Sequence, residues 1–236
     1  MTLTPEQFDL TQKRIVEHQH ERYEVDIQLN REIVLNNFIV FPNVLRPEIT
    51  SGLYFAKYLS GESEIFKNKS VLDMGCGSGI QGVVAGLSGA NKIVFSDIAE
   101  AAVENTKENV DKFNIKEKSF VIQGDLFREI NGQFDIILFN HPFFAESPNK
   151  EIPFTIAMYD NGSLIHRFLD EAKDYLNEGG FILMPFFHFA GDVNNPEKQA
   201  LAHGYSVEVE HEMELNDENI QKGQFSVYRL RPLENQ

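Results

Sequence analysis

Short apolar runs alternate with helical stretches from Ser70 onward, and this alternation limits the fold of the 236-residue chain more than any other feature. The predicted strands are 71–73, 93–96, 120–122, 134–139 and 181–186, and the predicted helices are 82–88, 99–113, 163–177 and 196–202. The first four runs are mostly apolar, which is typical of strands buried on both faces. Strands that alternate with helices predict an open, mostly parallel α/β sheet covered by helices on both faces.

The two ends of the chain depart from this pattern. Residues 206–215 and 224–230 have strand patterns with a loop between them, so we expect the sheet to end in an antiparallel hairpin. Near the N-terminus, Thr4-Pro5-Glu6-Gln7 has the residues of a helix start, with an N-cap threonine and a proline at the first helical position. The elements expected after it are strands at 23–29 and 33–41 and a helix at 52–59. We therefore expect an N-terminal helix and strand segment, 1–69, packed on a main domain, 70–236.

Composition narrows the function classes. The formal net charge is −15, which argues against broad binding to a phosphate backbone and makes nucleic acid a less favoured partner. Cys76 is the sole cysteine, so neither an intrachain disulfide nor a cysteine-based zinc site is expected, and a cytoplasmic location is favoured. The histidines show no metal-ligand spacing, and the sequence shows neither a membrane-length apolar run nor a signal-peptide pattern at its start.

A glycine-rich loop follows the first strand of the main domain. Its residues are Asp73-Met74-Gly75-Cys76-Gly77-Ser78-Gly79, and a helix comes next. Glycines permit a sharp turn and a close approach of a ligand to the backbone. The alternate glycines differ from the GxGxxG pattern of dinucleotide-binding proteins, and a Gly-Lys-Ser/Thr sequence is missing, which argues against a nucleotide-triphosphate loop. A dinucleotide dehydrogenase is the alternative interpretation, and both the glycine spacing of the loop and the terminal hairpin argue against it.

Two acidic residues follow the next two strands. Asp97 ends the second strand, where a carboxylate can accept hydrogen bonds from both hydroxyls of a ribose. Asp125 follows the third strand in Gly124-Asp125-Leu126-Phe127, where it can accept from an exocyclic adenine amine while Leu126 or Phe127 packs on the base. All these strand ends meet at the carboxyl edge of the sheet, where open α/β folds bind ligands.

The sequences VLDMGCGSG and GDLF, with Asp97 between them, resemble the class I S-adenosylmethionine-dependent methyltransferases over residues 70–231. The resemblance implies a Rossmann-like seven-stranded sheet and the cofactor S-adenosyl-L-methionine, converted to S-adenosyl-L-homocysteine. It implies that the methionine part lies over Asp73, Gly75 and Gly77, the ribose on Asp97, and the adenine near Asp125. The full set of implied cofactor-binding residues is Asp73, Gly75, Cys76, Gly77, Gly79, Asp97, Ile98, Asp125, Leu126 and Asn140. We interpret Cys76 as a small filler of the loop instead of a nucleophile.

A second motif follows the fourth strand. Phe139-Asn140-His141-Pro142-Phe143-Phe144 resembles the Asn-Pro-Pro-Tyr/Phe motif of methyltransferases that modify planar nitrogens, including the HemK/PrmC glutamine methyltransferases. The resemblance implies that the Asn140 side chain and the next backbone carbonyl accept the two N–H groups of the acceptor, with Phe143 stacked on it. Asn140, His141 and Phe143 are therefore the candidate catalytic residues. His141 replaces the first proline, and it is either a tolerated variant or a general base or substrate contact.

Other segments resemble the HemK-like branch more weakly. They are an Asp-Gly turn at 159–163, a Gly-Gly turn at 177–180 and a proline-bearing segment at 41–48. Residues 1–69 are a candidate cap over the cofactor pocket, in which Phe38, Phe41 and Arg46 either select the substrate or only pack.

Three functions are consistent with these motifs. The leading one is methyl transfer from S-adenosylmethionine to a planar nitrogen, with a glutamine-type amide of a protein favoured. The alternative is a small-molecule N- or O-methyltransferase, supported by His141, the phenylalanine-rich loops and the long loop 144–162. The third, from another class, is a cofactor-binding regulatory subunit without catalysis. The expected partner is a protein or small-molecule methyl acceptor and not a membrane, and the sequence does not indicate an oligomeric state.

Overall fold

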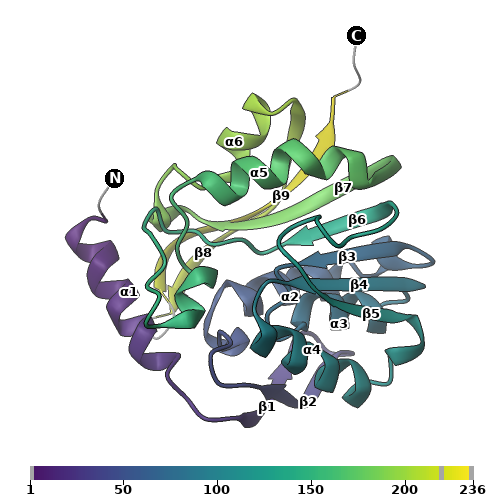
Figure 1. Cartoon of the computed structure of the whole chain (residues 1–236), viewed down its shortest axis with the longest axis horizontal. Helices are drawn as coiled ribbons and strands as arrows, with labels where there is room; N and C mark the ends of the chain where they lie inside the picture. Colours follow the sequence, from purple (N-terminus) through teal and green to yellow (C-terminus); the bar gives the residue numbers. More distant parts are fainter. Residues whose placement is uncertain (1–2, 218–220, 234–236) are drawn as a thin grey trace.

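A seven-stranded sheet forms the centre of the protein in a computed structural model that describes residues 3–217 and 221–233 (Figure 1). The strand order is β5-β4-β3-β6-β7-β9-β8. The strands from β5 to β7 are parallel, and β9 is antiparallel to both β7 and β8. The bounds are β3 Ser70–Met74, β4 Lys92–Asp97, β5 Ser119–Gln123, β6 Phe134–Phe139, β7 Leu176–Phe187, β8 Tyr205–Asp217 and β9 Gln221–Pro232. The predicted α/β class and terminal hairpin are confirmed, while the middle of the predicted loop between the hairpin strands lies outside the described residues.

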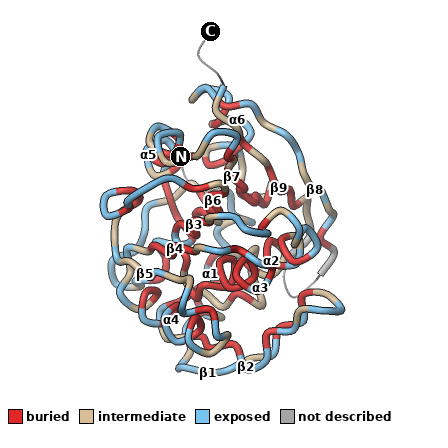
Figure 2. Tube along the Cα trace, turned by 90° about the vertical axis from the view of Figure 1, so that its right-hand side faces the viewer, coloured by how far each residue is buried: buried red, intermediate tan, exposed pale blue. Residues whose placement is uncertain are grey.

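Helices cover both faces of this sheet, as the alternation predicts. Figure 2 shows α5 on one side of the sheet and α2, α3 and α4 on the other. The bounds are α2 Ser51–Gly61, α3 Ile80–Leu87, α4 Glu100–Lys112, α5 Ser163–Ala172 and α6 Pro196–Ala202. Helix α3 lies so close to β4 that a Cβ on Gly82 would come within 2.7 Å of Cζ of Phe95. Because glycine is the residue that fits there, the glycine fixes the distance between this helix and the sheet.

Two expectations about the sheet were wrong. The strand β5 is not buried on both faces, because it is the edge of the sheet and Phe120 is 56% exposed. Helix α5 ends at Ala172, and the expected Gly-Gly turn lies inside β7. There the pairing jumps from Phe134↔Leu176 to Ile136↔Phe181, so residues 177–180 form a bulge in the strand.

The N-terminal segment has its own two-stranded sheet. Its elements are α1 Pro5–Glu17, β1 Tyr23–Gln28 and β2 Val34–Val40, and β1 pairs antiparallel with β2. The predicted helix start is confirmed, because Thr4 and Gln7 form a capping box with their side chains and backbone N–H groups. Side chains of α4 hold the hairpin to the main domain, since Asn109 Oδ1 accepts from the Ile39 N–H at 3.0 Å.

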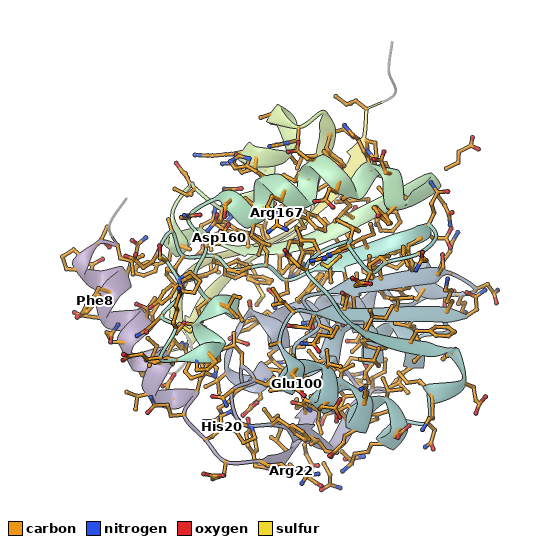
Figure 3. The ribbon with its side chains drawn as sticks, viewed as in Figure 1. Phe8, His20, Arg22, Glu100, Asp160 and Arg167 are labelled. Atoms are coloured by element: carbon orange, nitrogen blue, oxygen red, sulfur yellow. The ribbon has the colours of Figure 1, made fainter. Side chains whose placement is uncertain are left out.

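Helix α1 lies beside the carboxyl ends of the parallel strands (Figure 1). Its first turn is tied to the loop after β7, because Gln7 Nε2 donates to the Phe189 carbonyl at 2.8 Å. Phe8, on its outer side, is 52% exposed (Figure 3). The opposite side of α1 therefore faces the edge of the sheet at which open α/β folds bind ligands.

Candidate active site

A cavity of about 410 Å³ opens at the carboxyl ends of β3, β4 and β6. Part of its wall comes from the glycine loop, the end of β4 and Asn140, which directly follows β6. The rest comes from α1, residues 43–54, the loop that continues from β6 as far as Met158, and the ends of β7, β8 and β9. The cavity thus joins the two sequence motifs, which lie more than 60 residues apart in the chain.

The glycine loop turns sharply at each of its three alternate glycines. Gly75, Gly77 and Gly79 have φ angles of 62°, 56° and 82°, in the left-handed region that favours glycine. Gly75 and Gly77 line the cavity. A Cβ on Gly77 would meet no atom within 4 Å, so the space beside its backbone is open to a ligand. Gly79, the N-cap of α3, has a different role, because a Cβ there would lie 3.0 Å from the Thr106 side chain of α4.

Asp97 lies in the cavity wall at the end of β4. Its Oδ2 accepts from the Gly77 N–H and its Oδ1 from the Ala99 N–H, both at 2.9 Å. Burial raises the pKa of Asp97, although these two hydrogen bonds favour the charged carboxylate. The carboxylate is therefore held rigidly between the glycine loop and α4, where the sequence predicts a ribose contact.

Asp73 is placed differently from the expectation. It is 2% exposed and does not line the cavity. Its Oδ2 accepts from the Gly82 N–H at 2.9 Å, in the first turn of α3. Burial raises the pKa of Asp73 to about 8. We therefore revise the role of Asp73 from ligand contact to support of the glycine loop from below.

The residues predicted to surround an adenine also lie outside the cavity wall. Asp125 forms an ion pair with Arg167 of α5 at 2.7 Å, and Figure 3 labels Arg167. Leu126 is buried at a φ of 50°, and Ile98 is 48% exposed. Asp125 is held away from the cavity by its ion pair with α5. Leu126 adopts a left-handed turn, which a leucine in the sequence does not predict.

Cys76 is the filler that the sequence suggested. Its side chain is 3% exposed, and its Sγ lies 3.3 Å from Thr106 Oγ1. Burial raises the pKa of the Cys76 thiol well above its usual range, with the Asp97 and Asp73 carboxyls adding to the effect. A thiol that stays protonated is a poor nucleophile.

Asn140 follows β6 and lines the cavity with the glycine loop. Ser51, the first residue of α2, donates from Oγ to Asn140 Oδ1 at 3.1 Å. In this orientation the amide oxygen accepts the serine proton. A carbonyl oxygen has two lone pairs, so Oδ1 retains one acceptor site for a further N–H group.

His141 and Phe143 also line the cavity, and both are largely buried. The His141 Nε2 atom lies 2.7 Å from the carbonyl oxygen of Asn194. The ring of Phe143 meets the ring of His141 edge to face, with centroids 5.2 Å apart. The motif is therefore packed as one unit against the loop after β7.

The inner side of α1 supplies three residues to the cavity wall, Leu10, Arg14 and His18. Arg14 is 7% exposed and pairs with Glu17 at 2.7 Å. His18 Nδ1 accepts from the Arg46 N–H at 3.0 Å, and burial lowers the pKa of His18 to about 3. His18 is therefore neutral and anchors α1 to the segment before α2.

A short 3-10 helix, η4 Pro153–Ala157, completes this side of the cavity. Phe154 of η4 packs edge to face on His18, with ring centroids 5.8 Å apart. The wall formed by α1, η4 and the neighbouring loops is mostly apolar. Its apolar members include Leu10, Val44, Leu45, Ile49, Phe143, Phe144, Pro153, Phe154, Ile156, Ala157 and Met158, and the strands β7, β8 and β9 add Phe187, Leu215 and Phe225.

The three residues proposed from sequence for a cap do not line the cavity. Phe38 is fully buried against Phe113, Phe41 lies under the Arg22 guanidinium, and Arg46 pairs with Glu48 at 3.0 Å. For these residues the packing alternative holds. The residues that sequence reasoning missed include Ser51 and Asn194, and neither carries a motif that would have singled it out.

Two other kinds of site are missing from the described part of the chain. Within 3–217 and 221–233, no three His, Cys, Asp or Glu residues are grouped to hold a metal ion. No helix in the same ranges is long and apolar enough to cross a membrane.

Comparison with known proteins identifies the family. A profile of the methyltransferase small domain matches residues 54–192, more than half of the chain, and the match includes the glycine loop, Asp97 and Asn140. The chain belongs to the methyltransferase small domain family. The class I methyltransferase assignment made from the sequence is thereby confirmed, and the fold agrees with it.

Relatives of this family member act on different acceptors. A protein of Methanocaldococcus jannaschii, provisionally named protein N5-glutamine methyltransferase, is 36% identical over 121 residues, which are 49% of this chain and 60% of that protein. The ribosomal protein L11 methyltransferase of Thermotoga maritima is 36% identical over 155 residues, covering 63% of this chain and 55% of that protein. Both matches span less than two thirds of the relative.

A solved structure supports the fold alone. The Thermus thermophilus 16S rRNA N2 G1207 methyltransferase, in complex with AdoMet and guanosine, superposes with a TM-score of 0.65 at 15% identity. The superposition covers 90% of this chain and 51% of that one. The shared architecture therefore covers more of this chain than the 54–192 match does.

Proposed function

We propose that this protein transfers the methyl group of S-adenosylmethionine to a planar nitrogen held by Asn140. One observation carries the proposal: the glycine loop with Asp97 and the amide of Asn140 line the same cavity. Besides its implied contact with the cofactor, Asn140 belongs to the motif that resembles that of planar-nitrogen methyltransferases, so this arrangement favours an enzyme over a regulatory cofactor-binding subunit.

The residues present fit the cofactor. Open space beside the Gly77 backbone leaves room for a close ligand, and the partly exposed Asp97 carboxylate offers acceptors for two ribose hydroxyls. Gly75, Cys76 and Gly77 would hold the methionine part. When bound, S-adenosylmethionine supplies a methyl group on a sulfonium, which is a good leaving group.

Asn140 would orient the acceptor. Its Oδ1 already accepts from Ser51, so the amide is fixed before an acceptor arrives, and the remaining lone pair can take one N–H of the acceptor. The backbone carbonyl of His141 would take the second N–H. A nitrogen lone pair that is delocalised in an amide would then be aimed at the methyl group. The nitrogen would gain the methyl group and release one proton to water, with the thioether S-adenosylhomocysteine as the leaving group. Alignment of this kind supplies much of the rate.

A glutamine-type amide of a protein is the favoured acceptor. The Asn140–Phe144 motif resembles that of glutamine methyltransferases, and the Methanocaldococcus jannaschii relative bears such a name. The net charge of −15 argues against RNA or DNA as the acceptor.

A small-molecule acceptor is the second candidate, and a specific observation favours it. Residues 1–69 would act as a cap, since α1 supplies Leu10, Arg14 and His18 to a mostly apolar wall opposite the glycine loop. Pockets for small ligands are commonly concave and apolar with few polar groups.

The test is a transfer assay with methyl-labelled S-adenosylmethionine and a cell extract, separated into protein, nucleic-acid and small-molecule fractions. Label in the protein fraction supports the glutamine acceptor, and label in the small-molecule fraction supports the second candidate. Label in nucleic acid would contradict the charge argument. Asn140→Ala is the control, and label that persists with this variant would remove Asn140 from the mechanism.

A further inference from the structure

His141 is a buried hydrogen-bond donor. The ring is 3% exposed, and Nε2 lies 2.7 Å from the Asn194 carbonyl oxygen. A carbonyl oxygen only accepts, so Nε2 carries the proton and donates it. The other ring nitrogen, Nδ1, makes no hydrogen bond of good geometry among the described residues, although the Phe139 backbone also favours the protonated ring. Burial lowers the pKa of His141 to about 4, so the ring is neutral at physiological pH.

Asn194 completes the contact with its side chain. The residue is fully buried, and its Nδ2 donates to the Phe143 carbonyl at 3.2 Å and to the Asp160 carbonyl at 2.7 Å. The orientation of the amide is fixed, because a flip would turn Oδ1 toward two carbonyl oxygens. Asn194 thus accepts from the second residue of the Asn-His-Pro-Phe motif through its backbone and donates to the fourth through its side chain.

These hydrogen bonds join the motif to two other segments. The Asp160 N–H donates to the Phe144 carbonyl at 3.0 Å, and the Asp160 Oδ2 accepts from the Leu164 N–H at 3.0 Å in the first turn of α5. Asp160 therefore connects the motif to the start of α5, in the region where Figure 3 labels it. The loop after β6, which contains the motif, is therefore restrained by hydrogen bonds to the segment before α6 and, through Asp160, to α5.

Residue 141 is a proline in the motif that this segment resembles, and the hydrogen bonds of His141 and Asn194 restrict the same stretch of backbone. A proline ring fixes φ near −65° and removes conformations from the chain, whereas a histidine at that position leaves them accessible. Ordering the backbone of a residue costs conformational entropy, and buried hydrogen bonds to that residue can offset this cost.

We propose that His141 and Asn194 form a hydrogen-bonded clamp that replaces the first proline of the motif and holds Asn140 in position for methyl transfer. His141 is then a fixed donor and not a general base, and Asn194 is a positioning residue. The effect on the rate rests on the proposed function, whereas the hydrogen bonds and the state of the His141 ring do not.

The kinetic test uses Asn194→Ala, His141→Pro and the double variant. The readouts are the initial rate of label transfer from saturating S-adenosylmethionine into the accepting extract fraction, and the dissociation constant of S-adenosylmethionine. Asn194→Ala removes the side-chain hydrogen bonds to the Phe143 and Asp160 carbonyls but keeps the backbone carbonyl that accepts from His141. It should lower the rate at least tenfold and leave the dissociation constant within about twofold. In the double variant the proline ring should restore the rate to within about threefold of the wild-type protein.

Asn195→Ala is the matched control. Asn195 is a neighbouring buried asparagine whose Oδ1 accepts from the Glu197 N–H at 2.9 Å, as the N-cap of α6. This variant should be less stable, because it loses the helix cap, and it should keep its rate. Equal losses of rate in Asn194→Ala and Asn195→Ala would overturn the proposal, and so would a double variant that binds S-adenosylmethionine but stays slow.

A second measurement needs no methyl transfer and no variant. Nitrogen-15 NMR of the imidazole rings of the wild-type protein should show His141 protonated at Nε2 and bare at Nδ1 from pH 8 to pH 5. A ring protonated at Nδ1, or one that titrates near pH 6.5, would overturn the clamp. If this signature is present and no label is transferred to any fraction, the clamp stands and the proposed function fails.

Discussion

Asp97→Ala should weaken binding of S-adenosylmethionine, and it should also lower stability, because the same carboxylate accepts from the Gly77 and Ala99 N–H groups. The Asp97 carboxylate lines the cavity beside the glycine loop, where it can accept from two ribose hydroxyls. A hydrogen bond to a charged group contributes about 1.5–3 kcal/mol, so loss of two at the lower value removes about 3 kcal/mol. At about 1.4 kcal/mol for each tenfold change, the dissociation constant should rise on the order of 100-fold.

Isothermal titration calorimetry at pH 8 measures this change directly. A pH of 8 is chosen because burial raises the pKa of Asp97 and a higher pH favours the charged form. Asp97→Asn keeps one acceptor oxygen and should give a rise of about tenfold. Asp125→Ala is the control, since Asp125 pairs with Arg167 outside the cavity wall, and it should change the constant by less than about threefold.

The reasoning would be refuted by an Asp97→Ala protein that folds and binds S-adenosylmethionine with the wild-type constant. It would also be refuted if Asp125→Ala weakened binding as much as Asp97→Ala. The second result would restore the adenine contact that the sequence suggested and would require the Asp125–Arg167 ion pair to open on binding.

Three further outcomes are expected. Gly82→Ala should lower the free energy of unfolding by about 1–3 kcal/mol, measured by urea denaturation, because the new Cβ would overlap the Phe95 ring; an unchanged midpoint would show that α3 can shift. Cys76 should react with a thiol reagent such as dithionitrobenzoate only as fast as the protein unfolds, since burial raises its pKa, and rapid labelling of the native protein would contradict its assignment as a filler. Folding lowers the pKa of His18 from 6.5 to about 3. Between these two pH values the unfolded chain binds a proton at His18 and the folded chain does not. Below pH 6.5 the wild-type protein should therefore lose stability relative to His18→Gln, and parallel stability curves from pH 7 to pH 4 would refute the assignment.

The α/β fold could be predicted because its signals are local. Short apolar runs, helix starts such as Thr4 to Gln7 and the alternate glycines each depend on a few neighbouring residues. The exposed edge strand β5 could not be predicted in the same way, because Phe120 looks as apolar as the residues of a central strand. The strand order that leaves it at the edge is set by contacts far apart in the chain.

In the candidate site, too, residues in local motifs could be predicted, whereas residues placed by contacts far apart in the chain could not. Gly75, Gly77, Asp97 and Asn140 were found because they belong to motifs with a spacing, and all four line the cavity. The contribution of α1 was only partly foreseen: the N-terminal segment was expected as a cap, but through residues other than Leu10, Arg14 and His18. A helix face lines a cavity only when the helix packs beside it. The contacts that hold α1 there, such as the hydrogen bond from Gln7 to the Phe189 carbonyl, join residues far apart in the chain.

Asn194 shows the limit of motif reasoning most clearly. The replacement of proline by His141 was visible in the sequence, and its meaning was left open between a variant, a base and a substrate contact. The partner that gives it a role lies 53 residues further along the chain. Neither a periodicity nor a composition rule connects two such positions, because the connection is made by a loop after β7 that folds back over the motif.

The most direct test of the central claim is a single-turnover measurement of methyl transfer with Asn140→Ala, paired with the dissociation constant of S-adenosylmethionine. Removal of one preorganised polar group that acts on the reacting atoms typically lowers the rate by about 10²–10³-fold. We expect a loss of that size with a dissociation constant within about twofold of the wild-type value. A variant that binds the cofactor and transfers methyl at the wild-type rate would contradict the assignment of Asn140 as the residue that holds the acceptor.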